Sequence, residues 1–556
     1  MELLPRGWRL RRAARRHFGW DSLRAGQLGA MKALLRRRDA VVVLATGAGK
    51  SAIYQVPGMV MGRVTVVVCP LLALQQDQIA GLNGRGDPGL AVRISSAQTP
   101  RQNESALREL REGRARFLFI TPEQLADPAR LGEVRSLQPG LVAVDEAHCV
   151  SSWGYDFRPD YLHLGHMIVD LGRPPVVALT ATASPPVRED IATVLGMRDP
   201  FVVVAGLDRP NLRLAAVRCT SEEGRRRALL ERIAAQPSPG IVYAPTRAAS
   251  EDLAQRLRAA GIAATAFHAG LPTRERDRRH ADFMADQIPV MVATSAFGMG
   301  VDKPGIRWVF HAALPDSPDS YVQEIGRAGR DGADASTVLF FRSEDVALQR
   351  FFAGGAPAHA ELMELAAAIR HGAQADGTPL TRTALARTTG LPARRLTHLL
   401  TLLERTGAVG ITAGGRLTVP RHAPPPAEAA DIALREVARQ QTLRRSRTDM
   451  MRQYAETSGC RGRALLGYFG EAMNGTCGHC DNCADGPSHP HARTHAKQRQ
   501  PFPVRTVVRH AEWGAGTVMA YERDRMVVLF HEAGYKTLSV PIVRKRALLT
   551  AEQPTQ

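Results

Sequence analysis

Two stretches of the sequence carry residues that can bind and hydrolyse a nucleoside triphosphate. The first, residues 45–51, reads Ala-Thr-Gly-Ala-Gly-Lys-Ser and lies between an apolar run and a helical pattern. Backbone N–H groups of such a loop can surround phosphates, Lys50 can reach the β and γ oxygens, and Ser51 can bind Mg²⁺. Leu44 stands where this pattern usually has its first glycine. The expected nucleotide-binding residues are Thr46, Gly47, Ala48, Gly49, Lys50 and Ser51.

The second stretch is the acidic pair Asp145-Glu146, which ends another apolar run. Asp145 can hold the Mg²⁺ shell, and Glu146 can orient or deprotonate the attacking water. An acidic pair by itself can also be a solvated strand end. The presence of Lys50 in the same predicted domain favours the catalytic interpretation.

A third candidate group lies much later in the chain, where residues 323–330 read QEIGRAGR. Arg327 and Arg330 are three residues apart and share one face of a predicted helix. They can neutralise charge that grows on a γ-phosphate, as an arginine finger does. Gln323 is expected beside them, and a solvent-exposed basic helix is the alternative interpretation.

Aromatic and polar residues flank the first two groups. Gln27 can hydrogen-bond an adenine edge with Arg24 nearby, and Trp20 can stack on the base, although an amphipathic helix end would have the same residues. After the acidic pair, an aromatic and basic loop can stack on unpaired bases and bind phosphate; a core aromatic cluster is the alternative. The residues of this loop are Trp153, Phe157 and Arg158.

Four of the seven cysteines are clustered at positions 460, 477, 480 and 483. Four thiolates are the number that a closed tetrahedral Zn²⁺ site needs. The N-terminus lacks the apolar core of a secretory signal, so we expect a reducing compartment, which favours metal over disulfides. His479 is a possible substitute ligand, but four cysteines suffice. The expected structural zinc ligands are Cys460, Cys477, Cys480 and Cys483.

The overall charge points to a polyanionic partner. The chain has 73 Lys and Arg residues against 54 Asp and Glu residues, a formal net charge of +19. Such a charge fits nucleic acid or an acidic membrane surface as a partner, although a GC-rich genome that favours Arg and Ala is the alternative explanation. No run approaches the roughly 20 apolar residues that span a bilayer, so no membrane association is expected.

The pattern of elements predicts an α/β protein with two tandem lobes. Short apolar runs alternate with helical patterns up to about residue 205, and this rhythm restarts at Gly240. Such alternation is typical of a parallel sheet with helices on both faces. The expected strands are 41–44, 64–68, 117–120, 141–144 and 176–179, then 240–243, 264–267, 290–293, 308–311 and 337–341.

We expect six regions in all. They are lobe 1 (1–205), lobe 2 (206–345), a winged-helix-like domain (346–425), a zinc-binding module that begins with a long Arg-rich helix (426–486), a linker (487–502) and a small β-barrel (503–556).

A series of motifs resembles one known family. The motifs are HFGWDSLRAGQ, ATGAGKS, CPLLALQQDQ, DEAHCVSSWGYDFRP, ALTATA, YAPTR, FHAGL, ATSAFGMGVDKP and QEIGRAGRDG, over about residues 17–345. In this order they resemble the RecQ-type DNA helicases of superfamily 2. CRGRALLGYFGE and CGHCDNC resemble the zinc module of that family.

The resemblance implies two RecA-like lobes and 3′→5′ unwinding of DNA with ATP, Mg²⁺ and structural Zn²⁺. It assigns adenine binding to Arg24 and Gln27, with Trp20 at a stacking position that usually holds Tyr. It assigns the arginine finger to Arg330 and DNA sensing to the loop of Trp153, Phe157 and Arg158.

Several features depart from the family. The winged-helix-like segment precedes the zinc module instead of following it, no helical HRDC domain is found, and the expected wing tip at 412–416 has no aromatic residue. The C-terminal segment resembles the Tudor-like barrel of some UvrD/PcrA-type helicases, where it is linked to RNA polymerase binding. A generic SH3-like barrel that contacts DNA fits equally well.

The sequence therefore predicts a monomeric or weakly associating DNA helicase of repair or recombination, cytoplasmic and associated with the nucleoid. Single-stranded and duplex DNA are the expected partners, and RNA polymerase or another protein is a candidate partner of residues 503–548. The alternatives are an RNA helicase, or a DNA-binding or polymerase-associated regulator whose binding is gated by nucleotide.

Overall fold

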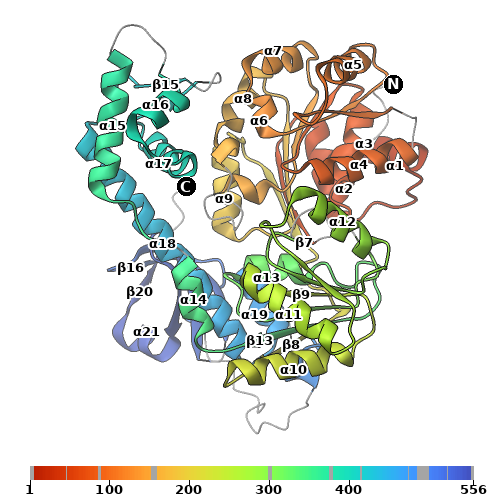
Figure 1. Cartoon of the computed structure of the whole chain (residues 1–556), viewed down its shortest axis with the longest axis vertical. Helices are drawn as coiled ribbons and strands as arrows, with labels where there is room; N and C mark the ends of the chain where they lie inside the picture. The colour runs from red at the N-terminus through yellow and green to blue at the C-terminus, as the bar shows by residue number, and fades with distance from the viewer. Residues whose placement is uncertain are drawn as a thin grey trace.

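The computed structural model describes most of the chain. The described residues are 6–45, 47–85, 89–151, 159–297, 303–352, 354–374, 380–412, 416–471, 473, 475–484, 500–522 and 524–552. They form two parallel sheets, a helical region and a C-terminal antiparallel sheet (Figure 1). This arrangement confirms the expected α/β fold class.

Lobe 1 is built on a seven-stranded sheet in which all neighbouring strands are parallel, in the order β3-β4-β2-β5-β6-β1-β7. The strands are β1 (Ala40–Leu44), β2 (Thr65–Val68), β3 (Ala91–Ile94), β4 (Phe117–Ile120), β5 (Leu141–Val144), β6 (Val176–Thr180) and β7 (Phe201–Ala205). The sequence pattern did not predict β3 and β7. These are the two edge strands; Arg93 interrupts the apolar run of β3, whereas β7 is apolar at every position and was missed all the same.

Helices cover both faces of this sheet and fill its two apolar cores. They are α1 (Arg6–Phe18), α2 (Ala25–Leu35), α3 (Ala52–Met61), α4 (Leu72–Arg85), α5 (Pro100–Arg111), α6 (Pro122–Leu125), α7 (Pro128–Ser136), α8 (Leu164–Asp170) and α9 (Pro185–Val194), with 3₁₀ turns at Ala147–Val150 and Pro159–His163. Since β1 and β5 run parallel, their carboxyl ends meet at one edge. The phosphate-loop segment and Asp145 follow these two ends directly.

Lobe 2 is a six-stranded parallel sheet in the order β10-β11-β9-β12-β13-β8. Its strands are β8 (Leu212–Arg218), β9 (Gly240–Tyr243), β10 (Ala264–Phe267), β11 (Val290–Ala293), β12 (Trp308–His311) and β13 (Ala335–Phe341). Its helices are α10 (Glu222–Ala234), α11 (Arg247–Ala259), α12 (Thr273–Met284), α13 (Pro318–Ile325) and α14 (Asp345–Phe352). The edge strand β8 was not predicted, because Arg213 and Arg218 interrupt its apolar pattern.

A helical module follows lobe 2. It comprises α15 (His359–Gln374), α16 (Arg382–Thr389), α17 (Ala393–Arg405) and a hairpin of β14 (Gly410–Ile411) and β15 (Leu417–Thr418). Its apolar core also contains Ala429 and Ala433 from the first half of α18 (Pro426–Glu456). The boundary expected at 425/426 therefore falls inside one shared core.

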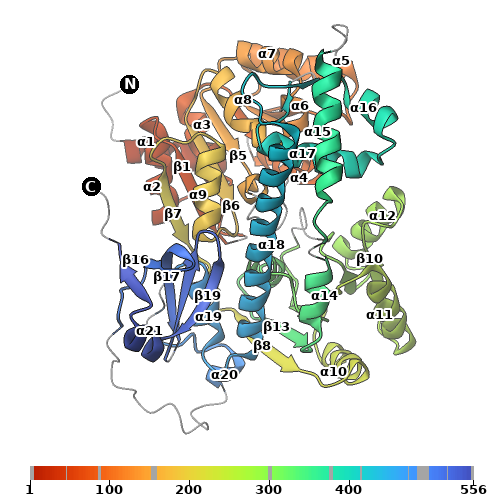
Figure 2. The same cartoon turned by 90° about the vertical axis from the view of Figure 1, so that its left-hand side faces the viewer.

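Helix α18 connects this module to lobe 2. It runs for 31 residues, and no glycine or proline occurs after its first position, so nothing in its sequence breaks the helix. The second half inserts Met451 and Tyr454 into the core of lobe 2. One rigid element thus belongs to two hydrophobic cores (Figure 2).

The C-terminal β-domain (residues 500–552) packs against the helical region. Its sheet order is β19-β18-β17-β16-β20, from β16 (Val507–His510), β17 (Gly514–Glu522), β18 (Arg525–Phe530), β19 (Gly534–Ser539) and β20 (Leu549–Ala551), with α21 (Val540–Arg546). Tyr535 of β19 stacks on Tyr468 at 4.6 Å between ring centroids. Tyr468 is the last residue of α19 (Arg461–Tyr468). The C-terminal β-domain therefore packs against the zinc module, although the sequence predicted a linker between them.

Among the described residues, no helix combines the length and the apolar character that crossing a bilayer requires.

Candidate active site and metal centre

A cleft of about 700 Å³ lies between the two lobes. It brings together the predicted nucleotide-binding and catalytic residues of the described part of the chain; Thr46 lies outside the described residues. The predicted residues that line it are Trp20, Arg24, Gln27, Gly47, Ala48, Gly49, Lys50, Ser51, Asp145, Glu146, Gln323, Arg327 and Arg330.

The start of α2 is tied to the phosphate-loop segment. Gln27 Nε2 donates to the carbonyl oxygens of Ala48 at 3.1 Å and Gly49 at 3.0 Å, and Arg24 Nη1 donates to Ala48 O at 3.3 Å. Gly49 has a φ of +78°, and a Cβ there would lie 2.8 Å from Gln27 Nε2. Both facts require glycine at this position. The two polar residues predicted to contact adenine therefore also contact the backbone of the phosphate loop.

Lys50 lies at the centre of the cleft. Its Nζ donates to the carbonyl oxygen of Leu44 at 3.2 Å. Burial lowers the pKa of Lys50 from its ordinary 10.5, while the nearby carboxylates of Glu146 and Asp145 oppose that shift. A partly buried cation that faces two carboxylates is suited to bind the oxygens of a phosphate chain together with a metal ion.

Asp145 is buried and held by two hydrogen bonds. Gln78 Nε2 donates to its Oδ2 at 2.6 Å, and the Glu146 amide donates to its Oδ1 at 3.0 Å. Tyr54 OH in turn donates to Gln78 Oε1 at 2.7 Å. Burial raises the pKa of Asp145 above its ordinary 3.8, and Glu146 adds to the shift. A divalent cation would favour the ionised carboxylate again, so these residues fit a Mg²⁺ site.

Gln78 and Tyr54 were not predicted as site residues. Gln78 lies in the quoted motif CPLLALQQDQ, which was the available signal. Tyr54 lies among apolar residues of α3, and nothing in the sequence pattern distinguishes it from a core residue.

Glu146 has a left-handed backbone with a φ of +48°. Such a conformation costs a non-glycine residue roughly 1 kcal/mol or more. It places the Glu146 carboxylate 3.3 Å from His148 Nδ1, which also shares a 2.9 Å hydrogen bond with Thr180 Oγ1. Thr180 ends β6 in the ALTATA motif and bonds to Thr182. His148 thus lies between Glu146 and Thr180 of β6; neither His148 nor Thr180 was among the predicted site residues.

Lobe 2 supplies α13 and the turn after it; α13 ends at Ile325, so the prediction that Arg327 and Arg330 share a helix face was wrong, and both lie in that turn. Gln323 and Arg327 are buried, and Arg330 faces the phosphate loop across the cleft. A Cβ at Gly47 would lie 3.9 Å from Arg330 Cγ. Arg330 is also close enough to Lys50 to lower its pKa. The two lobes are therefore close together at this point.

The predicted DNA-sensing residues Trp153, Phe157 and Arg158 lie outside the described residues. The segment before them is anchored, since Ser151 Oγ donates to Asp190 Oδ2 of α9 at 2.7 Å.

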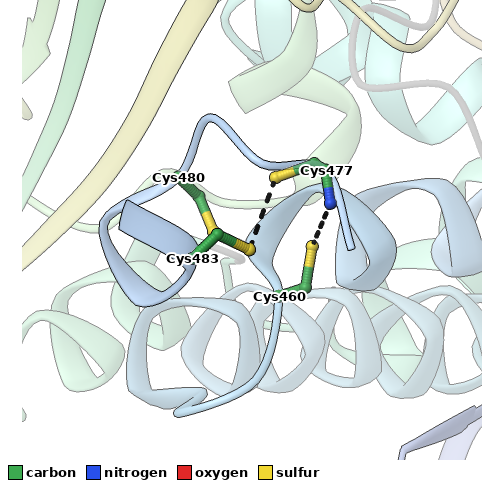
Figure 3. Close-up of side chains that lie close together, drawn as sticks. All are labelled: Cys460, Cys477, Cys480 and Cys483. Atoms are coloured by element: carbon green, nitrogen blue, oxygen red, sulfur yellow. Dashed lines mark hydrogen bonds between the residues drawn. The ribbon is translucent and has the colours of Figure 1, made fainter. Parts of the chain in front are cut away.

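The four clustered cysteines meet at one point (Figure 3). Their sulfur atoms all lie within 4.8 Å of one another, and the pair from Cys477 and Cys483 is 4.0 Å apart. Tetrahedral zinc with Zn–S bonds of about 2.3 Å puts sulfur atoms about 3.8 Å apart, so the set fits a closed zinc site. Cys460 Sγ also accepts from the Cys477 amide at 3.1 Å.

The residues around the cysteines join this cluster to lobe 2. His479 Nδ1 bonds to the carbonyl oxygen of Leu212 at 2.9 Å, so its ring is used outside the thiol cluster. Asp481 accepts from the amide of Ala216 at 3.0 Å and from Arg461 Nε at 2.6 Å. The zinc module is thereby pinned to the edge strand β8.

Three family profiles match the chain. They are described as DEAD/DEAH box helicase over residues 24–191, helicase conserved C-terminal domain over residues 225–332, and RecQ zinc-binding over residues 430–484.

Curated relatives match over the two lobes. The chain is 38% identical over 332 residues to the ATP-dependent DNA helicase RecQ of Pasteurella multocida, which covers 59% of this chain and 52% of that protein. It is 36% identical over 333 residues to the probable ATP-dependent DNA helicase RecS of Bacillus subtilis, with 60% and 66% covered. The chain thus spans about half the length of the first of these relatives.

Solved structures share the fold at lower identity. The Mycobacterium smegmatis helicase Lhr, bound to single-stranded DNA and AMP-PNP, superposes with a TM-score of 0.50 at 20% identity. The match covers 77% of this chain and 61% of that one.

Proposed function

The chain belongs to the RecQ family of superfamily 2 helicases, and from this premise we propose that it is an ATP-dependent DNA helicase that moves 3′→5′ and unwinds duplex. The observation that carries the proposal is the cleft in which Lys50 and Asp145 of lobe 1 face Arg330 of lobe 2. Residues of both lobes form one site, as is required of a motor whose cleft closes when ATP binds.

We assign nucleotide binding to the face of lobe 1. Gln27 and Arg24 would hold the adenine, with Trp20 beside it, and the loop of residues 46–51 would hold the phosphates. Ser51 and Asp145 would hold Mg²⁺, which when bound neutralises charge on the phosphate oxygens.

Hydrolysis then depends on groups from both lobes. Glu146 orients the attacking water and takes its proton, and its carboxylate is positioned by the His148–Thr180 contact. Arg330 neutralises charge on the γ-phosphate as it departs, with Gln323 and Arg327 beside it. Because Arg330 belongs to lobe 2, hydrolysis is coupled to closure of the cleft.

We further propose how the motor engages DNA. The loop of Trp153, Phe157 and Arg158 would sense single-stranded DNA, and residues 346–486 would hold duplex through its phosphates. Trp153→Ala should then keep basal ATPase activity and lose stimulation by DNA. The six regions expected from the sequence remain the proposed domain organisation, with the qualification that α18 belongs to two cores.

The cellular assignments are also proposals. A role in repair or recombination, in the cytoplasm and on the nucleoid, fits the family. RNA polymerase or another protein remains the proposed partner of residues 503–548, and a monomer or weak oligomer the proposed state.

Steady-state ATP hydrolysis tests the central proposal. We expect stimulation by single-stranded DNA over the rates with RNA or with no nucleic acid. Stimulation by RNA alone would replace the DNA helicase with an RNA helicase, and indifference to both would favour a nucleotide-gated regulator.

The role of Glu146 has its own test. Glu146→Gln should lower kcat by roughly 10²–10⁴-fold, since it removes a general base. Glu104→Gln on α5, which removes an exposed carboxylate far from the cleft, is the control. A parent-like rate in Glu146→Gln would exclude the assigned proton transfer.

A further inference from the structure

A second, basic groove lies outside the nucleotide cleft. It has a volume of about 700 Å³ and is formed where α18 passes between α14 and β19 (Figure 2). Its lining residues are Arg350, Thr442, Arg445, Ser446, Asp449, Arg452, Gln453, Tyr535, Lys536 and Thr537. One wall belongs to the C-terminal β-domain, so the groove exists only where that domain docks.

The docking of β19 fixes the shape of the groove. Thr537 Oγ1 donates to Gln453 Oε1 at 2.7 Å, which ties the strand to α18. At the start of β19, a Cβ at Gly534 would lie 2.3 Å from Ser446 Oγ, and this glycine has a φ of +70°. The backbone therefore approaches α18 as closely as only glycine permits. The groove is formed in advance of any ligand.

The charge of the groove is strongly positive. Arg445 and Arg452 lie seven residues apart on one face of α18, and both are exposed. Lys536 of β19 and Arg350 of α14 also line the groove, and Lys536 Nζ lies 5.3 Å from the centroid of the Trp513 ring. Asp449 is the one carboxylate among the lining residues, and it lies 3.5 Å from Arg350. Four cations against one anion leave a net charge of about +3.

The chemistry of the lining matches a phosphodiester backbone. Besides the cations, it offers hydroxyl and amide groups of Thr442, Ser446, Gln453 and Thr537. Such groups bind phosphate oxygens without reading sequence. Proteins that hold single strands rely on aromatic rings that stack on bases, whereas the one ring in this lining, Tyr535, is only 5% exposed.

We propose that this groove binds the phosphate backbone of double-stranded DNA, and that the C-terminal β-domain forms part of this binding surface. The helical module of α15–α17 packs on the other half of α18, so a duplex held there can continue along the same helix. The inference rests on the proposed DNA helicase function and extends the duplex contact proposed for residues 346–486 to β19 of the C-terminal β-domain.

Binding of labelled DNA by the full-length protein tests the groove. Arg445→Ala/Arg452→Ala should weaken binding of a blunt duplex roughly tenfold at low salt, and should lower the slope of log K against log salt by about 2. Lys536→Ala should act in the same direction by about half as much. A single strand of equal length should bind nearly as it does to the parent protein.

A matched control removes the same charge elsewhere. Arg227→Ala/Arg232→Ala changes two exposed arginines of α10 in lobe 2 and should leave the duplex affinity and the salt slope close to those of the parent. ATPase activity at saturating single-stranded DNA should be unchanged in all three variants.

The outcomes separate the two proposals. Equal duplex affinity in the groove variant and the control variant would overturn the groove, and so would equal losses for duplex and single strand. Failure of the parent protein to hydrolyse ATP faster with DNA would overturn the helicase function instead.

Discussion

At the scale of single residues, the cleft holds two groups whose ionisation is shifted in opposite directions. Burial lowers the pKa of Lys50 and raises the pKa of Asp145. Each shift favours the neutral form of the group. In the nucleotide-free cleft, the charged forms of Lys50 and Asp145 are therefore less stable than those of a solvent-exposed lysine and aspartate. Phosphate and Mg²⁺ restore both charges when they bind.

These pKa shifts predict that the ATPase is active over a narrower pH range than an ordinary aspartate and an ordinary lysine would allow. Asp145 must be ionised to hold Mg²⁺, and because its pKa is raised above 3.8, activity should begin to fall at a higher pH than for an ordinary aspartate. Lys50 must be protonated, and because its pKa is lowered from 10.5, the alkaline limb should come earlier than for an ordinary lysine. The measurement is kcat/KM for ATP against pH, which reports the free enzyme. Limbs at the two ordinary values would contradict these assignments.

At the scale of elements, the sequence predicted every central strand of the two lobes and the edge strand β10, and missed the edge strands β3, β7 and β8. The strands β1, β2, β4, β5 and β6 are continuous buried runs, which a pattern of apolar residues reveals. In β8, Arg213 and Arg218 stand where a buried strand would have apolar residues, so its sequence resembles a loop. Gln78 was also missed. Its hydrogen bond to Asp145 depends on how α4 packs beside the end of β5, which the sequence pattern does not give.

The zinc module shows how one element can stabilise another. Cys480 forms a backbone bridge with Leu214 of β8, and Asp481 binds the next part of the same strand. An edge strand that the lobe itself holds on one side is thereby held on the other by the cysteine cluster.

Cys480→Ser should therefore release zinc and loosen more than its own module. Structural zinc contributes on the order of 10 kcal/mol to folding of such sites, so we expect loss of the metal and faster hydrogen exchange both in residues 427–483 and in β8. Cys69→Ser, in lobe 1 and outside the cluster, is the control. Unchanged zinc content by elemental analysis would refute the site, and protection of β8 equal to that of the parent would refute the coupling.

At the scale of the whole molecule, catalysis requires the lobes to meet. Arg330 approaches Gly47 from the opposite lobe, so its contribution should appear only in the closed state.

Arg330→Ala should lower kcat by roughly 10³-fold or more while the KM for ATP changes little, because an arginine finger acts on charge that develops during reaction. Arg330→Lys should restore little, since a point charge cannot reproduce the planar guanidinium. Binding of single-stranded DNA should be retained in both variants. A proportional rise in KM at constant kcat would instead assign Arg330 to ground-state binding.

Helix α18 connects lobe 2 to the α15–α17 module, so a rotation of lobe 2 would displace that module. Its 31 residues extend about 46 Å at about 1.5 Å per residue, with lobe 2 fixed to one end and the α15–α17 module to the other. A rotation of lobe 2 by about 10° would swing the far end of such a rod by about 8 Å, more than the rise of two base pairs at about 3.4 Å each. We therefore expect rotation of lobe 2 to displace the far end of α18, where Glu404 of α17 lies 3.2 Å from His163 of lobe 1, by a distance comparable to the DNA repeat.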